Sequence, residues 1–176
     1  MIHITKERKE DYLEIDKVIQ ASFSGLPYSD GLETDLISRI RNSDDYISDL
    51  ALVAKEEDKF LGYTILSPIT IKSEETAAIS KGLVLPIIGV IPEYQNKTIG
   101  SRLIEKAHDY ANALGYKFIV LIGQPEFFQK FDYTSCAKHG IDFHFQVPDN
   151  FGLIKELKNG CLEDISGTVH YPELFY

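Results

Sequence analysis

A short polar stretch, QNKT at 95–98, separates an apolar run from a segment with helical spacing. The first turn of a helix presents unpaired N–H groups and the positive end of the helix dipole, so such a junction suits a phosphate group. Gly100 lets a bulky anion approach the backbone, Lys97 adds a cation, and Ser101 adds a hydroxyl donor. The stretch therefore predicts an anion-binding loop. A plain loop in which Thr98 caps the helix explains the same residues.

The other reactive side chains form no motif. The loop matches neither GxxxxGK[ST] nor GxGxxG, so it is neither a P-loop nor a dinucleotide-binding fingerprint. Cys136 has no neighbour in sequence that would lower the pKa of its thiol, which indicates a structural cysteine. His139 and His144 are close in sequence but have no carboxylate at ligand spacing, so we expect no metal site.

Apolar periodicity predicts the elements that position this loop. Helical spacing covers 99–114, and apolar strands are expected at 83–91 before it and at 117–122 after it. Strand, helix and strand in this order predict a right-handed βαβ unit. Pro86 cannot donate to a ladder and Gly89 packs weakly, so the first of these strands should be irregular or bulged at its middle.

The remainder of the chain predicts a strand, two helices and a hairpin ahead of that unit. The second helix should begin near Asp30, with Glu33 as its capping-box partner. The tail from about 139 onward reads as strands and turns. The other expected elements are strands at 2–5, 50–55 and 60–71 and helices at 11–23 and 125–131.

Length and charge restrict the class of protein. A chain of 176 residues with 44% hydrophobic residues is typical of one soluble domain. The net charge of -9 and the absence of a basic run argue against a nucleic-acid partner. An acidic surface can attract a cationic amine or serve solubility alone. No apolar run approaches the ~20 residues of a membrane span, and the first residues are too polar for a secretory signal. Two cysteines make no disulfide framework, so we expect a cytoplasmic protein without a membrane partner.

The segment GVIPEYQNKTIGSRLIEKA (89–107) resembles the central motif of the GNAT superfamily of acyl-CoA-dependent N-acyltransferases. That motif is an apolar strand, then (Gln/Arg)-x-x-Gly-x-(Gly/Ala), then a helix, and Gln95 and Gly100 match it. The order of the expected elements is also similar, and the tail together with GQPEFFQKFDY resembles the bacterial subgroup called YhbS-like. The resemblance implies an α/β (α+β) fold with a mixed, mostly antiparallel sheet, a splayed central strand pair and flanking helices. It places a GNAT domain at 1–147 and a C-terminal extension at 148–176, packed on the same domain.

The resemblance also implies how acetyl-CoA binds as acyl donor, without a metal. In the family, one strand splays from its neighbour, and its free backbone groups hold the pantetheine arm while the loop and helix start hold the pyrophosphate. The positions in this chain that correspond to the strand part are Ile88, Gly89 and Val90, with the Val90 N–H polarising the acyl carbonyl. Those that correspond to the loop part are Gln95, Asn96, Lys97, Thr98, Ile99, Gly100 and Ser101.

Four positions depart from the family pattern. Thr98 fills the first glycine position of the motif, and Asn96 replaces a residue that is often glycine in the subgroup. Where many members carry a glutamate that accepts a proton from the amine, this chain has Val84. Where many carry a tyrosine that protonates the leaving thiolate, it has Phe128. The catalytic residues are therefore left unassigned.

The resemblance implies an N-acetyltransferase that moves an acetyl group from acetyl-CoA to a primary amine, on a small molecule or a peptide, by direct attack. Loss of acid and base help typically costs 10²–10⁴-fold in rate and does not forbid the reaction. One alternative is a non-catalytic acyl-CoA-binding or regulatory domain of the same fold, which the residues at 84, 98 and 128 favour. Another is an interaction module that binds no cofactor. Neither the acceptor nor the oligomeric state can be read from the sequence.

Overall fold

The structure, a computed structural model, describes residues 1–148 and 150–176. It divides into two compact units. Unit 1 comprises Met1–Ser67 with Ile87–Tyr110, and unit 2 comprises Pro68–Pro86 with Ala111–Tyr176. Two long strands, β3 (Lys59–Lys72) and β4 (Ile79–Val90), contribute residues to both.

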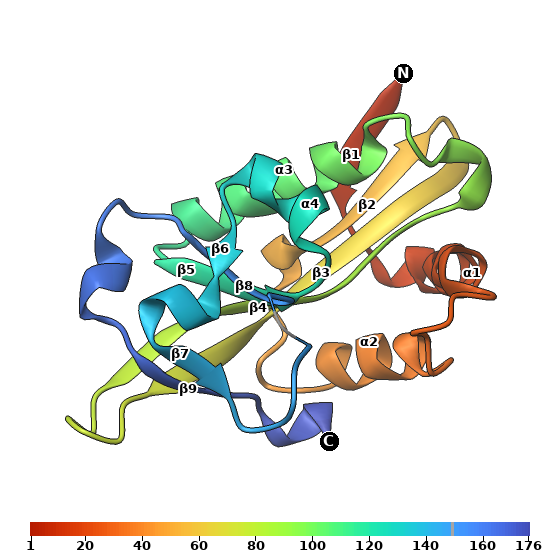
Figure 1. Ribbon diagram of the computed structural model, residues 1–176. Coiled ribbons are helices and arrows are strands. Elements are labelled where there is room, and N and C mark those ends of the chain that lie inside the picture. The colour runs from red at the N-terminus through yellow and green to blue at the C-terminus, as the bar shows by residue number, and fades with distance from the viewer. Residues whose placement is uncertain (149) are drawn as a thin grey trace. The chain divides into compact units, whose positions relative to one another are not determined.

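Unit 1 is built on strands β1 (Ile2–Lys6) and β2 (Ala51–Glu56) and the adjoining parts of β3 and β4, in the order β1-β2-β3-β4. The β1–β2 and β2–β3 pairs are antiparallel. Helices α1 (Tyr12–Phe23) and α2 (Glu33–Arg41) lie on one side of these strands, and α3 (Ile99–Ala113) begins on the other (Figure 1). Consecutive residues of β2 and of the adjoining part of β3, and one stripe of each helix, are buried because both faces of these strands are covered.

A buried ion pair holds α2 against the residue that follows β1. Arg41 Nη2 lies 2.7 Å from Glu7 Oε2, and the exposed fractions of the two side chains are 6% and 0%. The Tyr46 hydroxyl donates to the other Glu7 oxygen at 2.8 Å. A buried charge without its partner is strongly destabilising, so this network keeps α2 in one position.

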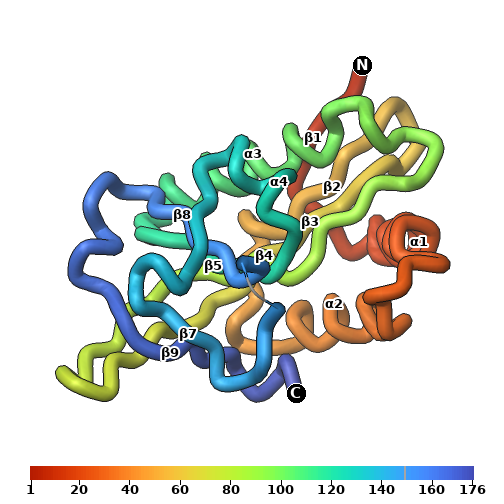
Figure 2. Tube along the Cα trace, in the orientation of Figure 1, coloured from red at the N-terminus to blue at the C-terminus, as the bar shows by residue number. Residues whose placement is uncertain are grey.

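Unit 2 contains the only parallel neighbour of β4 among the described residues, β5 (Phe118–Ile122). Strand β5 pairs antiparallel with β8 (Gly152–Glu156), which also pairs with the short β6 (Thr134–Ser135). On the other side, β9 (Gly167–His170) pairs antiparallel with β3 and parallel with β7 (Ile141–Phe143), as the chain trace shows (Figure 2). One apolar cluster, which includes Val84, Phe118 and Cys136, forms the core of this unit.

The remaining helices are short. Helix α4 spans Pro125–Phe128. Single 3₁₀ turns cover Lys9–Asp11, Ser48–Leu50, Pro92–Tyr94, Gln129–Phe131, Cys136–His139, Cys161–Asp164 and Glu173–Phe175. No helix in the described part of the chain is long and apolar enough to cross a membrane.

The structure corrects one local prediction. Helix α2 begins at Glu33 and has no capping box from Asp30, because the Asp30 carboxylate instead accepts the Leu32 N–H at 2.9 Å, two residues on, in a turn that precedes the helix. Strand β4 runs from Ile79 to Val90 through Pro86 and Gly89, and an irregularity or bulge at its middle stays a prediction. The predicted division at 147/148 stays a prediction, and position 149 lies outside the described residues.

Candidate functional site

The loop between β4 and α3 has several backbone N–H groups that make no backbone hydrogen bond among the described residues. Asn96 and Thr98 have φ of 62° and 66°, in the left-handed region. Among the described residues, no backbone partner is found for the N–H groups of residues 96–101, and the first paired N–H is that of Arg102, which donates to the Thr98 carbonyl at 3.0 Å. Successive N–H groups that alternate with left-handed residues form a concavity that binds anions. The helix start adds the positive end of the α3 dipole to it.

The backbone conformation of Thr98 is energetically unfavourable for a threonine. A left-handed φ is uncommon for any residue except glycine, and a β-branched side chain makes it a marked outlier. Within the described chain, its hydroxyl has no hydrogen-bond partner, so the prediction that Thr98 caps the helix through its side chain is wrong. The glycine that the family has at this position is the residue that the observed φ favours.

The helix start itself leaves room for a ligand. A Cβ built on Gly100 would have Val90 Cγ2, at 3.9 Å, as its nearest neighbour, so the space over this residue is open. Ile99 is 1% exposed as a whole residue and belongs to the buried apolar residues of unit 1, so its side chain is not available to a ligand. Ser101 is half-buried one position further on.

Two lysines stand over the same aromatic ring beside the loop. Lys97 Nζ lies 4.8 Å from the centroid of the Tyr94 ring, and Lys59 Nζ lies 4.6 Å from it. Lys59 comes from the first residue of β3, and sequence reasoning missed it because no local pattern connects it with the loop. The pair adds positive charge beside the Tyr94 ring, at the start of the loop.

The end of β4 is fastened to the loop and to its neighbours in unit 1. Gln95 Nε2 donates to the Val90 carbonyl at 3.0 Å, and the Ile91 N–H donates to Leu61 O at 2.9 Å. A Cβ on Gly89 would lie 2.9 Å from Ser22 Cβ, so this glycine is required for α1 to pack against β4. Gln95 therefore positions the strand end, a role that the motif alone does not indicate.

The ladder between β4 and β5 is short. It consists of Leu83↔Ile119 and Val84↔Val120, and two residues later Pro86 has no N–H with which to extend it. Ile88, Gly89 and Val90 follow further along β4, outside this ladder. A strand end outside a ladder has backbone groups available for a ligand.

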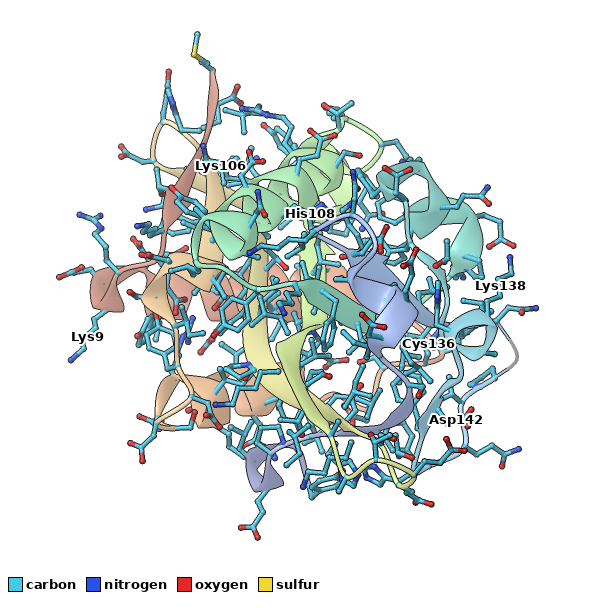
Figure 3. All side chains as sticks on the ribbon, turned by 90° about the vertical axis from the view of Figure 1, so that its left-hand side faces the viewer. Lys9, Lys106, His108, Cys136, Lys138 and Asp142 are labelled. Atoms are coloured by element: carbon cyan, nitrogen blue, oxygen red, sulfur yellow. The ribbon has the colours of Figure 1, made fainter. Side chains whose placement is uncertain are left out.

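The family's acid and base positions hold no ionisable group. Val84 is 2% exposed and Phe128 8%, and the Phe128 ring packs edge-on against Phe127 and Tyr133. Cys136, labelled in Figure 3, is 2% exposed, and burial raises the pKa of its thiol to about 12, as expected for an unreactive cysteine. Among the described residues, no group of three or more His, Cys, Asp or Glu side chains is arranged to hold a metal ion.

Comparison with known proteins gives one consistent result. The model of the acetyltransferase (GNAT) family matches residues 13–133. A relative from Escherichia coli (strain K12), named uncharacterized N-acetyltransferase YhbS, is 24% identical over 162 residues, which cover 92% of this chain and 90% of the relative.

Two solved structures share the fold over nearly the whole chain. A GNAT family acetyltransferase from Brucella melitensis, in complex with acetyl-CoA, has a TM-score of 0.80 at 24% identity and covers 100% of this chain and 99% of its own. The Escherichia coli YhbS structure, in complex with CoA, has a TM-score of 0.83 at 22% identity and covers 99% of this chain and 91% of its own. They confirm the predicted mixed α/β fold, with a mostly antiparallel sheet and flanking helices.

Proposed function

Because the chain belongs to the acetyltransferase (GNAT) family, we propose that it transfers an acetyl group from acetyl-CoA to a primary amine by direct attack. The observation that carries this proposal is the row of unpaired N–H groups at residues 96–101, with two left-handed residues and the start of α3. Such a row suits the pyrophosphate of a CoA ester. The complexes of the two structural neighbours with acetyl-CoA and CoA support the same ligand.

In this proposal, each part of the donor meets one segment of the chain. Backbone groups of Ile88, Gly89 and Val90 hold the pantetheine arm, and the Val90 N–H polarises the acyl carbonyl. The Val90 carbonyl accepts one bond from Gln95 and has a second lone pair for the arm. Residues 95–101 hold the pyrophosphate, mainly through the backbone, with Lys97 and Lys59 nearby.

When bound, acetyl-CoA supplies an activated thioester. The chain itself contributes orientation, because holding an amine beside a thioester replaces a bimolecular encounter and can account for much of the rate. The acceptor is a small-molecule or peptide amine.

Titration calorimetry with acetyl-CoA tests the donor site. Gly100→Val should abolish detectable binding, because its side chain would occupy the open space over the helix start while touching little of the protein. Lys97→Ala should raise Kd about fivefold, the scale of ~1 kcal/mol for a partly exposed charged contact. Lys106→Ala is the matched control: Lys106, labelled in Figure 3, is an exposed lysine on α3 outside the loop, and its loss should leave Kd unchanged.

A Gly100→Val variant that is folded, as judged by thermal melting, and binds acetyl-CoA like the parent would mean that the loop is not the donor site. The non-catalytic alternative rests on the absence of an ionisable group at Val84 and Phe128 and on threonine in place of glycine at position 98. A thiol-release assay over a panel of amines separates it from the enzyme: binding of acetyl-CoA without release above hydrolysis for any amine would favour the non-catalytic domain.

A further inference from the structure

Two lysines of unit 1 lie over one tyrosine ring. Lys59 Nζ is 4.6 Å from the centroid of the Tyr94 ring, and Lys97 Nζ is 4.8 Å from it. Lys59 is the first residue of β3, Tyr94 ends the 3₁₀ turn Pro92–Tyr94, and Lys97 lies in the loop that precedes α3. The two ammonium groups are therefore no farther apart than the sum of these two distances. All three residues belong to unit 1, so they are placed within one compact unit.

This pair of lysines has no carboxylate partner in the described part of the chain. Neither Lys59 nor Lys97 forms a salt bridge there, although the chain has 27 acidic residues and 18 basic ones. Glu93 is next to Tyr94 in sequence and is exposed, but it too forms no salt bridge with either lysine. Two like charges held close together repel each other, so the cluster presents positive charge that no salt bridge balances.

The ring of Tyr110, in the same unit, shows what distinguishes this cluster. It also has two lysines over it, Lys6 at 5.0 Å and Lys106 at 5.5 Å from the ring centroid. There, however, Lys6 Nζ forms a salt bridge with Asp49 Oδ1 at 2.6 Å, so a carboxylate of the chain already balances one of the charges. Two lysines over a ring are therefore not a ligand site by themselves. At Tyr94, both charges remain available to an anion from solution.

The chemistry of the proposed donor indicates which anion this is. A phosphate monoester carries a charge of about −1.5 to −2 at pH 7, and lysine binds it as a compact point charge. CoA contains a diphosphate between its pantetheine arm and its ribose, and a phosphate monoester on the 3′ oxygen of that ribose. Only the ribose separates the two groups, so a diphosphate held by the N–H groups of residues 96–101 brings the monoester close to the same loop. Lys97 is part of this loop, and Tyr94 precedes its first free N–H by two residues.

We propose that Lys59 and Lys97, held over Tyr94, bind the 3′-phosphate of the donor, so that the protein selects CoA thioesters over thioesters that lack this group. The inference rests on the proposed CoA site and adds a selection that the motif at 95–101 does not contain. Lys59 lies outside the loop and acts on the 3′-phosphate alone, whereas Lys97 belongs to the loop and acts on the diphosphate as well. Tyr94 is a positioning residue, because its ring holds both ammonium groups.

Titration calorimetry of CoA and of dephospho-CoA into the parent protein measures this selection. The two ligands differ only in the 3′-phosphate, so the ratio of their Kd values isolates its contribution. We expect CoA to bind at least tenfold more tightly, because each of two partly exposed charged contacts contributes a factor of about five. An excess of inorganic phosphate should leave the ratio within twofold. Loss of the ratio in phosphate would mean that the lysines hold free phosphate, and would overturn the assignment.

Variants of the cluster assign the selection to its residues. Lys59→Ala should raise the Kd of CoA about fivefold and leave that of dephospho-CoA within twofold, whereas Lys97→Ala should weaken both ligands. Lys106→Ala removes a lysine from the Tyr110 ring in the same unit and is the matched control, which should change neither Kd. Tyr94→Phe keeps the ring and should keep the selection, while Tyr94→Leu should reduce it about two- to fivefold. Thermal melting establishes that each variant is folded.

³¹P NMR of CoA bound to the protein gives a direct readout of the contact. The 3′-phosphate has its own resonance, separate from those of the diphosphate. Two ammonium groups beside the monoester favour its dianion, so its second pKa should fall below the value of about 6 that such a group has in water. In Lys59→Ala this pKa should move back toward that of free CoA, while the diphosphate resonances of the bound ligand stay where they are in the parent.

The outcomes separate this inference from the proposed function. A parent protein that binds CoA and dephospho-CoA with Kd values less than tenfold apart overturns the inference and leaves the CoA site in place. A Lys59→Ala variant that loses affinity for both ligands equally, or for neither, overturns the role of Lys59. If the parent binds neither ligand, the proposed function fails, and this inference fails with it.

Discussion

At the scale of single residues, the side chain of Thr98 disfavours the left-handed backbone conformation that this residue adopts in the loop. Its φ of 66° places a β-branched residue in the left-handed region, where a non-glycine residue costs of order 1–3 kcal/mol. Glycine would remove that strain and add about 0.5–1 kcal/mol of backbone entropy cost. The strain is the larger quantity, so the native threonine lowers the stability of the loop.

Thr98→Gly should therefore raise the free energy of unfolding by about 1 kcal/mol, measured by urea denaturation. Asn96→Gly is the matched control, since Asn96 has a similar φ of 62° but asparagine tolerates the left-handed region. Its gain should be clearly smaller. Equal gains at both positions, or none at Thr98, would show that the loop is not strained in this way.

Asp11 is a second residue whose environment sets a measurable property. Burial alone would raise the pKa of its carboxyl, but hydrogen bonds from Lys55 Nζ at 2.8 Å and from the Arg8 N–H at 2.9 Å hold it below 3.8. A depressed folded-state pKa contributes stability above the unfolded-state value, and that contribution disappears as the pH falls through the folded-state value.

Asp11→Asn should be less stable than the parent by about 1–2 kcal/mol at pH 7, the scale of a hydrogen bond to a charged group. The difference should shrink as the pH falls below the unfolded-state value of about 4 and through the lowered folded-state pKa, because the parent then loses its charge. Chemical denaturation at several pH values measures it. A difference that is constant across this range would mean that the Asp11 charge does not contribute.

At the scale of elements, the contact between α1 and β4 depends on a missing side chain. A Cβ on Gly89 would lie 2.9 Å from Ser22 Cβ and 3.2 Å from Ile19 Cδ1, so a strand of ordinary residues could not lie against this helix at the same distance. The segment proposed to bind the pantetheine arm is thus held in place from the α1 side. The close packing of α1 against β4 therefore accounts for glycine at position 89, independently of any ligand that its backbone binds.

Gly89→Ala should destabilise the protein by about 1–3 kcal/mol through overpacking. Ser22→Gly removes the atom in contact and should recover part of that loss, which gives an interaction energy above about 0.5 kcal/mol in a double-mutant cycle. Gly100→Ala, where a Cβ meets only an atom at 3.9 Å, is the control and should cost nothing. Strict additivity of Gly89→Ala and Ser22→Gly would remove the α1 contact as the reason for the glycine.

At the scale of the molecule, the charge of -9 opposes the proposed ligand. A CoA ester is an anion, so the summed field repels it at a distance even though Lys59 and Lys97 attract it locally. The Debye length falls from about 30 Å at 0.01 M salt to about 8 Å at 0.15 M, which screens the distant charges more than the two nearby lysines.

The association rate constant of acetyl-CoA should therefore rise severalfold between 0.01 M and 0.15 M salt, as measured by stopped-flow fluorescence. Lys97→Ala should steepen this rise, because it removes a local attraction that salt weakens. A rate constant that falls with salt in the parent would show that the two lysines dominate the field that an approaching ligand experiences.

Local pattern by itself determined much of this protein. The α3 helix, predicted at 99–114, spans Ile99–Ala113, and the strands on either side of it were predicted in the right order, because periodicity and turn residues act over a few neighbours. The loop proposed to bind the donor was likewise predicted from a polar stretch before a helix. The mixed α/β fold followed from the order of these elements and the resemblance of the motif.

Tertiary structure decided what those elements bring together. Lys59 reaches Tyr94 only because β3 starts beside the loop, and Tyr176, His144 and Val169 meet across separations of 32 and 25 residues. The β4–β5 ladder consists of two residue pairs, and its extent depends on how β5 lies along β4, which the sequence of β4 alone does not specify. Contacts of this kind depend on which strands pair and in which register, and a pattern that repeats every two or four residues carries no information about either.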